Sequence, residues 1–221
     1  MANELDEMTG PVKAEGRDVN VIAKQLPVKV GVGSLIFEIL LWVLGIIPGV
    51  VFLIMKVKAR SYFLKLQQKL QHDASQIDNY LEQRVMILQN AAKLLDKSIA
   101  LDKETFTQIA AYRSGVTHDD SERVAVAGEI DKVYAQIRVA MENYPELQAH
   151  KDIQEAMRQN SYLQKEITAA REVYNDTVNR WNTDIYAWPT KMIVAARQGY
   201  TTRIPFATTQ EVKDQARGVF F

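Results

Sequence analysis

Residues 30–55 form one uninterrupted apolar stretch of 26 residues, VGVGSLIFEILLWVLGIIPGVVFLIM, in which Glu38 is the single charged side chain. At about 1.5 Å of rise per residue, a helix of this length can cross a bilayer core of about 30 Å with some tilt. The stretch therefore predicts a transmembrane helix over residues 30–55. A polar tail of residues 1–29 would then lie on one side of the membrane, and the rest of the 221-residue chain on the other.

A cleaved signal peptide is the competing interpretation of an early apolar run. This run is too long, and it is followed by the basic segment KVKAR at residues 56–60 instead of a small-residue cleavage site. Basic residues collect on the cytoplasmic side of a span, so we expect the tail outside and the large C-terminal part in the cytoplasm. The same basic residues should contact anionic lipid headgroups, at about 1 kcal/mol each near the surface. The predicted headgroup contacts are Lys56, Lys58, Arg60, Lys65 and Lys69.

Composition excludes several kinds of chemistry. The chain has no cysteine, so disulfides, thiolate metal sites and a cysteine nucleophile are ruled out. Its 27 basic and 27 acidic residues balance, so no global field favours nucleic acid. The three histidines have no metal-binding partner at helical spacing, and there is no phosphate-binding glycine loop or nucleophile elbow. We therefore expect no cofactor, no metal and no enzymatic activity.

The remainder of the chain has the pattern of long helices. Apolar residues recur at alternating steps of three and four, which marks one face of a packed helix. In the first helix, continuous with the apolar run, they are Leu66, Leu70, Ala74, Ile77, Leu81, Val85, Leu88, Ala92, Leu95 and Ile99. A second helix presents Val126, Ile130, Val133, Ile137 and Met141, and a third presents Ile153, Ala156, Leu163, Ile167, Ala170, Tyr174, Val178, Trp181 and Ile185.

Turn signals separate these helices. Asp102 can begin a short helix to about Ser114, the second long helix should end at Tyr144-Pro145, and Pro189 should close the third. The predicted fold is all-α: an N-terminal transmembrane helix continuous with an antiparallel bundle of long helices. The bundle should occupy residues 56–189, and residues 190–221 should form a C-terminal tail.

Several motifs, in order, resemble the bacterial LemA family. They are the S-x-ID-x-x-L-x-x-R pattern at residues 75–84, ENYPEL at 142–147, AREVYN at 170–175 with WNT at 181–183, and the aromatic-proline pair at 188–189. The family-motif positions are Asn143, Tyr144, Pro145, Glu146, Leu147, Arg171, Tyr174 and Asn175. The resemblance covers about residues 56–206; Gln89 and Trp181 depart from it, replacing the usual proline and tyrosine. It implies a bacterial single-pass cytoplasmic-membrane protein with a helical domain and no agreed biochemical activity.

The apolar run itself carries the most specific binding hypothesis. At 100° per residue, its small and polar residues share one helical face: Gly31, Ser34, Glu38, Gly45 and Gly49. The last two glycines have the GxxxG spacing that lets membrane helices approach closely, and a carboxyl group at that depth needs a hydrogen-bonding partner. We therefore expect self-association through this face, with a neutral Glu38 bonded to Ser34 or to a backbone carbonyl of a neighbouring copy. The alternative is that Glu38 reaches toward the interface and the glycines have no role.

Three other clusters admit both a functional and a structural interpretation. The Tyr144-Pro145 turn could dock a partner, or it could only end a helix. The aromatic residues Tyr174, Trp181, Tyr186 and Trp188 could form a ligand platform, although a packed core seam is more typical of such spacing. The acidic residues after His118 could bind a divalent ion, but a turn and helix cap explain them better.

Two functional hypotheses follow from this sequence. The first is a membrane scaffold in which copies of the chain associate with one another and with anionic lipid, organising or curving a membrane patch. The second is a monomeric membrane-tethered adaptor that binds a soluble partner through its bundle. Substitution of Glu38 or Gly45 should matter for the scaffold and not for the adaptor.

Overall fold

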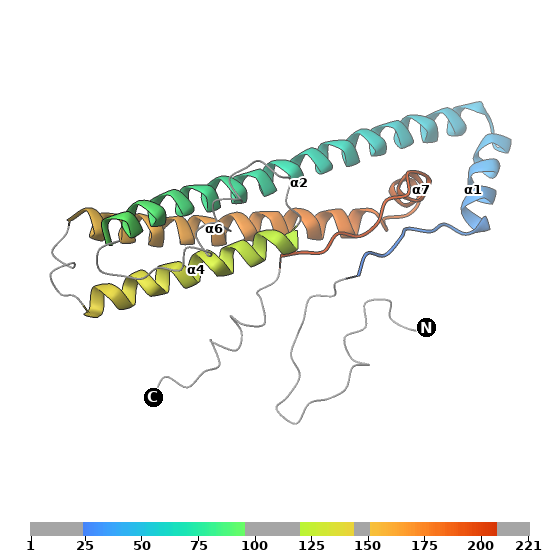
Figure 1. Ribbon diagram of the computed structural model, residues 1–221. Helices are drawn as coiled ribbons and strands as arrows, with labels where there is room; N and C mark the ends of the chain where they lie inside the picture. The colour runs from blue at the N-terminus through green and yellow to red at the C-terminus, as the bar shows by residue number, and fades with distance from the viewer. Residues whose placement is uncertain (1–23, 96–119, 144–150, 207–221) are drawn as a thin grey trace, which may run out of the picture. The chain divides into compact units, whose positions relative to one another are not determined.

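The computed structural model describes residues 24–95, 120–143 and 151–206, and within these ranges every regular element is a helix (Figure 1). This confirms the predicted all-α class. The helices are α1 (Val32–Val43), α2 (Ile46–Leu95), α4 (Asp120–Asn143), α6 (Lys151–Asp184) and α7 (Thr190–Arg197). The short helix predicted from Asp102 lies outside the described residues.

Contacts divide the chain into two compact units instead of the single bundle predicted over residues 56–189. Of the described residues, the first unit contains 24–72 and 174–206, and the second contains 73–95, 120–143 and 151–173. Both α2 and α6 contribute one part to each unit.

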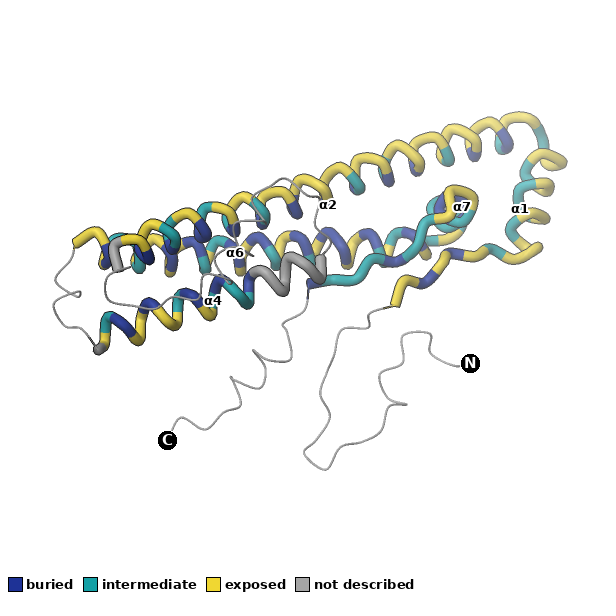
Figure 2. The backbone as a smooth tube through the Cα atoms, viewed as in Figure 1, coloured by how far each residue is buried: buried dark blue, intermediate teal, exposed yellow. Residues whose placement is uncertain are grey.

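The second unit is a three-helix bundle whose core follows the predicted periodicity. Its buried side chains include Ile77, Leu81, Val85, Leu88, Ile130, Val133, Ile137, Ile153, Leu163 and Ile167. Figure 2 shows these buried positions recurring along the inner side of each helix. Helix α6 runs antiparallel to the other two helices, as predicted, while α2 and α4 run in the same direction (Figure 1).

The first unit is built around the aromatic ring of Phe63 on α2. This ring is fully buried and meets Trp181 of α6 edge-to-face at 5.5 Å and Tyr200 at 5.6 Å between ring centroids. Trp181 and Tyr200 also contact each other at 5.2 Å. Such edge-to-face pairs add stability beyond the burial of their apolar area. The aromatic seam predicted from sequence is therefore core at Tyr174 and Trp181.

The predicted single helix over residues 30–55 is wrong, because the chain breaks at Leu44 and Gly45 between α1 and α2. Gly45 has φ +137°, a conformation that side-chain-bearing residues rarely adopt. Pro48 lies in the first turn of α2, where its missing N–H leaves no intrahelical bond unmade. Among the residues that the structure describes, no helix combines the length and apolar content that a membrane span requires.

Residues 190–206, predicted to begin a C-terminal tail, are instead an ordered part of the first unit. Helix α7 buries Thr190, Ile193, Val194 and Ala195. The segment that follows is extended and makes one isolated antiparallel bridge, between Thr201 and Pro27. Helix α7 could not be predicted from the sequence because its eight residues are too few to show a clear helical period.

Candidate membrane-contact site

Helix α1, the turn after it and the first turns of α2 form an apolar hairpin, residues 32–55. Most of the large exposed hydrophobic side chains of the described residues lie here or next to it. They are Val32, Leu35, Ile36, Ile39, Leu40, Trp42, Val43, Leu44, Ile46, Ile47, Val50, Val51, Leu53, Ile54, Met55 and Val57. Exposure reaches 75% at Ile46 and 78% at Ile47. Figure 2 shows this exposure along α1 and the start of α2.

The two arms of the apolar hairpin are held together by aromatic packing. The Trp42 indole lies so close over Gly49 that a Cβ placed there would be 2.5 Å from the ring. The Phe37 ring meets Phe52 edge-to-face at 5.6 Å and Trp188 at 5.1 Å between centroids. The absence of a side chain at Gly49 therefore allows α1 and α2 of the same chain to approach each other, since Trp42 of α1 fills the space beside it.

Glu38 is ion-paired within the chain. The Lys56 ammonium donates to Glu38 Oε2 at 2.9 Å, and the Arg197 guanidinium donates to Glu38 Oε1 at 2.5 Å. The predicted bond to Ser34 is replaced by these two charges, which come from α2 and α7.

The prediction that five small and polar residues share one helical face is wrong, because the chain breaks between α1 and α2. Gly31 caps the start of α1, Gly45 lies in the turn, and Gly49 lies on α2 against Trp42. Only Ser34 and Glu38 lie within one helix, α1.

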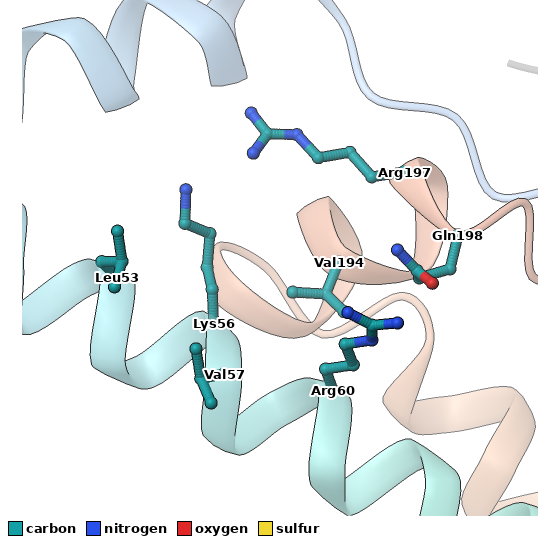
Figure 3. A pocket seen from close by; sticks show the side chains of 7 residues that line it. All are labelled: Leu53, Lys56, Val57, Arg60, Val194, Arg197 and Gln198. Carbon is teal, nitrogen blue, oxygen red and sulfur yellow. The ribbon is translucent and has the colours of Figure 1, made fainter.

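A pocket of about 230 Å³ opens between α2 and α7 (Figure 3). Two of its lining residues, Lys56 and Arg197, are those that pair with Glu38. Its wall combines apolar and basic side chains: Leu53, Lys56, Val57, Arg60, Val194, Arg197 and Gln198. In Figure 3, Lys56 and Arg197 extend from their two helices toward the same space, and Arg60 lies one turn further along α2. No described carboxylate lies within ion-pair distance of Arg60. The pocket can therefore accept an anionic group that carries an apolar chain.

The predicted headgroup contacts do not form one cluster. Lys56 and Arg60 lie on the α7 side of α2 and line the pocket. Lys58, Lys65 and Lys69 are exposed on other parts of the helix surface. Arg197 could not be predicted as part of this site because it lies 141 residues beyond Lys56 and reaches the pocket only through the packing of α7.

Two asparagines of α6 hold the extended segment that follows α7, here called the strap (residues 200–206). Asn182 donates to the Arg203 carbonyl at 2.8 Å and accepts from the Arg203 N–H at 2.8 Å. Asn175 makes the same two bonds with Phe206, at 3.1 and 2.7 Å. Seven residues of helix and three of extended chain both span about 10 Å, so the two spacings match.

Aromatic residues reinforce the strap beside each asparagine. The Trp181 indole N–H donates to the Thr201 carbonyl at 2.9 Å, and Tyr174 packs edge-to-face on Phe206 at 5.0 Å. The family-motif residues Tyr174 and Asn175 therefore fix the strap. Tyr186 and Trp188 are 37% and 58% exposed and lie outside this core.

A polar network closes the end of α6 against α2. The Tyr62 hydroxyl donates to Asp184 and accepts from Arg180 Nε at 2.9 Å, and Lys191 donates to Asp184 at 2.6 Å. Burial alone would raise the pKa of Asp184, but bonds from Lys191 and Tyr62 and nearby positive charge hold it below its usual value. Burial and the bond to Asp184 raise the pKa of Tyr62.

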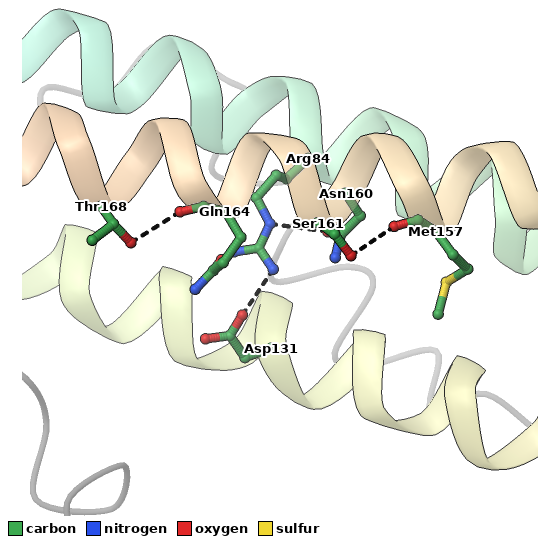
Figure 4. A network of polar contacts seen from close by, with 7 residues as sticks. All are labelled: Arg84, Asp131, Met157, Asn160, Ser161, Gln164 and Thr168. Carbon is green, nitrogen blue, oxygen red and sulfur yellow. Dashed lines mark hydrogen bonds and ion pairs between the residues drawn. The ribbon is translucent and has the colours of Figure 1, made fainter.

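The second unit contains a buried arginine, Arg84, which is the last residue of the family pattern at residues 75–84 (Figure 4). Arg84 is 1% exposed and donates to Asn160 Oδ1 at 3.0 Å and to Asp131 Oδ1 at 2.8 Å. Arg171 is half-buried on α6, and its pKa is lowered by burial and by Arg84, while Asp131 opposes the shift.

The other predicted site residues are only partly described. Asn143 is the last residue of α4, and Tyr144, Pro145, Glu146 and Leu147 lie outside the described residues. The docking role considered for the turn therefore stays a prediction. The acidic segment after His118 is also outside them, except for Asp120 at the start of α4.

Together these features define a helical protein in which two asparagines of α6 hold the strap and basic side chains lie beside the apolar hairpin. The model of the LemA family matches residues 73–221, and the chain belongs to the LemA family. This confirms the resemblance seen in the motifs. The chain is also 26% identical over 201 residues to Protein LemA of Metamycoplasma hominis, across 88% of this chain and 89% of that protein.

Proposed function

We propose that this chain is a helical scaffold bound to the bacterial cytoplasmic membrane, where it associates with copies of itself and organises or curves a membrane patch. The observation that carries the proposal is the exposed surface of the apolar hairpin. Soluble proteins rarely expose contiguous apolar surface on this scale, and such patches mark membrane or protein contacts.

The energetics favour lipid as the medium for this surface. Burying one large aliphatic side chain contributes about 1.5–3 kcal/mol. Ile46 and Ile47 alone, both more than 70% exposed, would therefore contribute several kcal/mol on entering the acyl chains. Arg60 lines the pocket beside the Glu38 ion pairs and has no described carboxylate partner, which supports a further contact with lipid phosphate.

Self-association is the second part of the proposal and rests on the same surface. Because Glu38 is paired with Lys56 and Arg197, the contact between copies is assigned to the outward apolar side chains of α1. In a bilayer no hydrophobic effect drives helices together, because lipid is as apolar as their side chains. Van der Waals packing between such side chains can nevertheless associate the helices. Substitution of Glu38 should accordingly affect the hairpin within each copy.

Flotation with lipid vesicles tests membrane binding. We expect the full chain to float with vesicles, and Ile46→Ser with Ile47→Ser to weaken partitioning by about tenfold or more for each residue. Val139→Ser is the matched control, because Val139 is 51% exposed on α4 and its loss should leave flotation unchanged. Equal flotation of all variants would contradict a contact through the hairpin.

The mass of the chain in native-lipid particles tests the assembly. A discrete oligomer is expected, and Leu35→Ser on the outward side of α1 should reduce its size. A monomer in lipid would leave the membrane contact intact and would replace the scaffold by an adaptor that tethers another protein.

A further inference from the structure

From these contacts we infer that the apolar hairpin enters the bilayer from one side only, so that residues 24–28 and the strap with α6 and α7 of the first unit lie on the same face of the membrane. This inference rests on the proposed membrane binding and adds the mode of insertion. It differs from the single-pass topology that the apolar run suggests on its own.

The main observation is the attachment of the segment before α1 to the strap after α7. The Val28 N–H donates to the Tyr200 carbonyl at 3.2 Å, and the Thr202 N–H donates to the Leu26 carbonyl at 2.9 Å. The Leu26 N–H also donates to Thr202 Oγ1 at 2.7 Å. These bonds flank the bridge between Pro27 and Thr201, which is a position where proline needs no N–H.

Burial shows that this attachment is part of the folded unit. Leu26 is 7% exposed and Val28 is 4% exposed, while the neighbouring residues of the same segment face outward. The strap is itself fastened to α6 by Asn175 and Asn182. A helix crossing the bilayer over residues 30–55 would pull Leu26 and Thr202 to opposite faces and break every one of these bonds.

The charges of the hairpin agree with entry from one side. Between Glu38 and Lys56 the chain has no charged residue, and these two residues are joined to each other at 2.9 Å. Their pairing brings the polar boundaries of the two arms together, with Arg197 of α7 at the same place. The uncharged residues 39–55 lie between these boundaries and form the part that meets acyl chains.

The partner of this surface is the leaflet on the side of the domain. Arg60 and Arg197 line the pocket at the charged boundary, where the phosphates of that leaflet would lie. The first turns of α2, from Ile46 to Met55, have a length of about 15 Å along the helix axis, which is half the thickness of a bilayer core. The hairpin therefore matches the acyl region of one leaflet.

Cysteine labelling can test the topology without background, because the chain has no cysteine. Gln25→Cys precedes the hairpin, and Asn179→Cys lies on α6 within the same unit; both positions are exposed. We expect a membrane-impermeant maleimide to modify both positions in the same preparation, either intact spheroplasts or inverted membrane vesicles. Neither position should be modified in the other preparation. Labelling of Gln25→Cys from the opposite face to Asn179→Cys would overturn the inference.

A disulfide provides a second readout that does not depend on accessibility. Pro27 and Thr201 form a non-hydrogen-bonded antiparallel pair, a geometry in which Cα atoms are about 4.5 Å apart and within disulfide range. Pro27→Cys with Thr201→Cys should form a disulfide within one chain when washed membranes are oxidised, identified by mass spectrometry of the joined peptides. Each single variant is the control.

The outcomes separate this inference from the proposed function. Release of the chain from membranes by carbonate would overturn membrane insertion and the inference together. A retained chain that labels on opposite faces, or that forms the disulfide only between two copies, would overturn the one-sided hairpin and leave the membrane scaffold in place.

Discussion

At the scale of single residues, Gly49 shows how closely the apolar hairpin is packed. Gly49→Ala would place a methyl group 2.5 Å from the Trp42 indole, so the ring must move at a cost of about 1–3 kcal/mol. We expect the ¹⁹F resonance of fluorotryptophan at Trp42 to shift in this variant. Gly33→Ala on α1 is the control, because nothing lies within 4 Å of its added carbon. An unmoved Trp42 resonance would argue against the hairpin turn.

Arg84 gives a second prediction at this scale. Arg84→Ala leaves a cavity and a buried Asn160 without its donor, so the free energy of unfolding should fall by about 2–4 kcal/mol. Arg84→Met should cost less, and adding Asn160→Leu should recover stability because both polar partners are then gone. Urea unfolding in detergent measures this series, with exposed Lys93→Ala as the control. Equal stability of Arg84→Ala and Lys93→Ala would contradict a structural role.

At the scale of elements, the strap depends on two amide side chains that each bind one backbone position. Asn182→Ala should speed hydrogen exchange at the Arg203 N–H, and Asn175→Ala should do so at the Phe206 N–H. Asn182→Asp keeps the acceptor oxygen, so the Arg203 N–H should stay more protected than in Asn182→Ala. Asn179→Ala, exposed between them, is the control. Unchanged exchange at both amides would show that other contacts hold the strap.

The network that joins Tyr62 of α2 to Asp184 of α6 should make stability depend on pH. The folded pKa of Asp184 lies below its usual value, so its contribution is present above about pH 4 and is lost as pH falls through the folded pKa. The folded pKa of Tyr62 lies above 10.0, so its contribution is present below that pH and is lost as pH rises through the folded pKa.

Tyr62→Phe removes the part of this dependence that comes from the Tyr62 hydroxyl, while Lys191 still lowers the pKa of Asp184. The wild-type chain should exceed this variant in stability by about 1–3 kcal/mol near neutral pH, since the lost hydrogen bond joins a charged group. That advantage should shrink below pH 4 and above pH 10, as measured by urea unfolding across the range. A constant difference at every pH would contradict the assigned pKa directions.

Helix positions were predictable from the sequence, because buried residues such as Ile77, Ile130 and Ile167 repeat every three or four positions. The break at Gly45 was missed, although Gly45 and Pro48 were visible local signals, because the apolar run favoured one continuous helix. Arg84 was part of the family pattern at residues 75–84, but its burial was not predicted, because a polar residue at a core position leaves no mark in a hydrophobic pattern. Contacts between distant segments, such as Glu38 with Arg197, leave no local signal at all.

At the scale of the whole molecule, the membrane contact links the apolar hairpin to the family fold. The matched family region begins at residue 73, after the hairpin, so the exposed apolar surface lies on the part of the chain that precedes it. Glu38→Leu should therefore loosen the hairpin by removing two ion pairs while leaving the second unit folded. Hydrogen exchange should rise in residues 32–60 and stay unchanged in the Arg84 region.

The most direct measurement of the central claim is quenching of tryptophan fluorescence by lipids brominated on their acyl chains. Trp42 lies on the exposed hairpin and Trp181 is buried in the first unit. Trp188 is also exposed and packs on Phe37, so the measurement is made in a Trp188→Phe background. If the hairpin enters the acyl chains, brominated vesicles should quench the Trp188→Phe variant strongly and the Trp42→Phe, Trp188→Phe double variant far less. Equal fractional quenching of both would show that the hairpin does not enter the bilayer and would contradict the account.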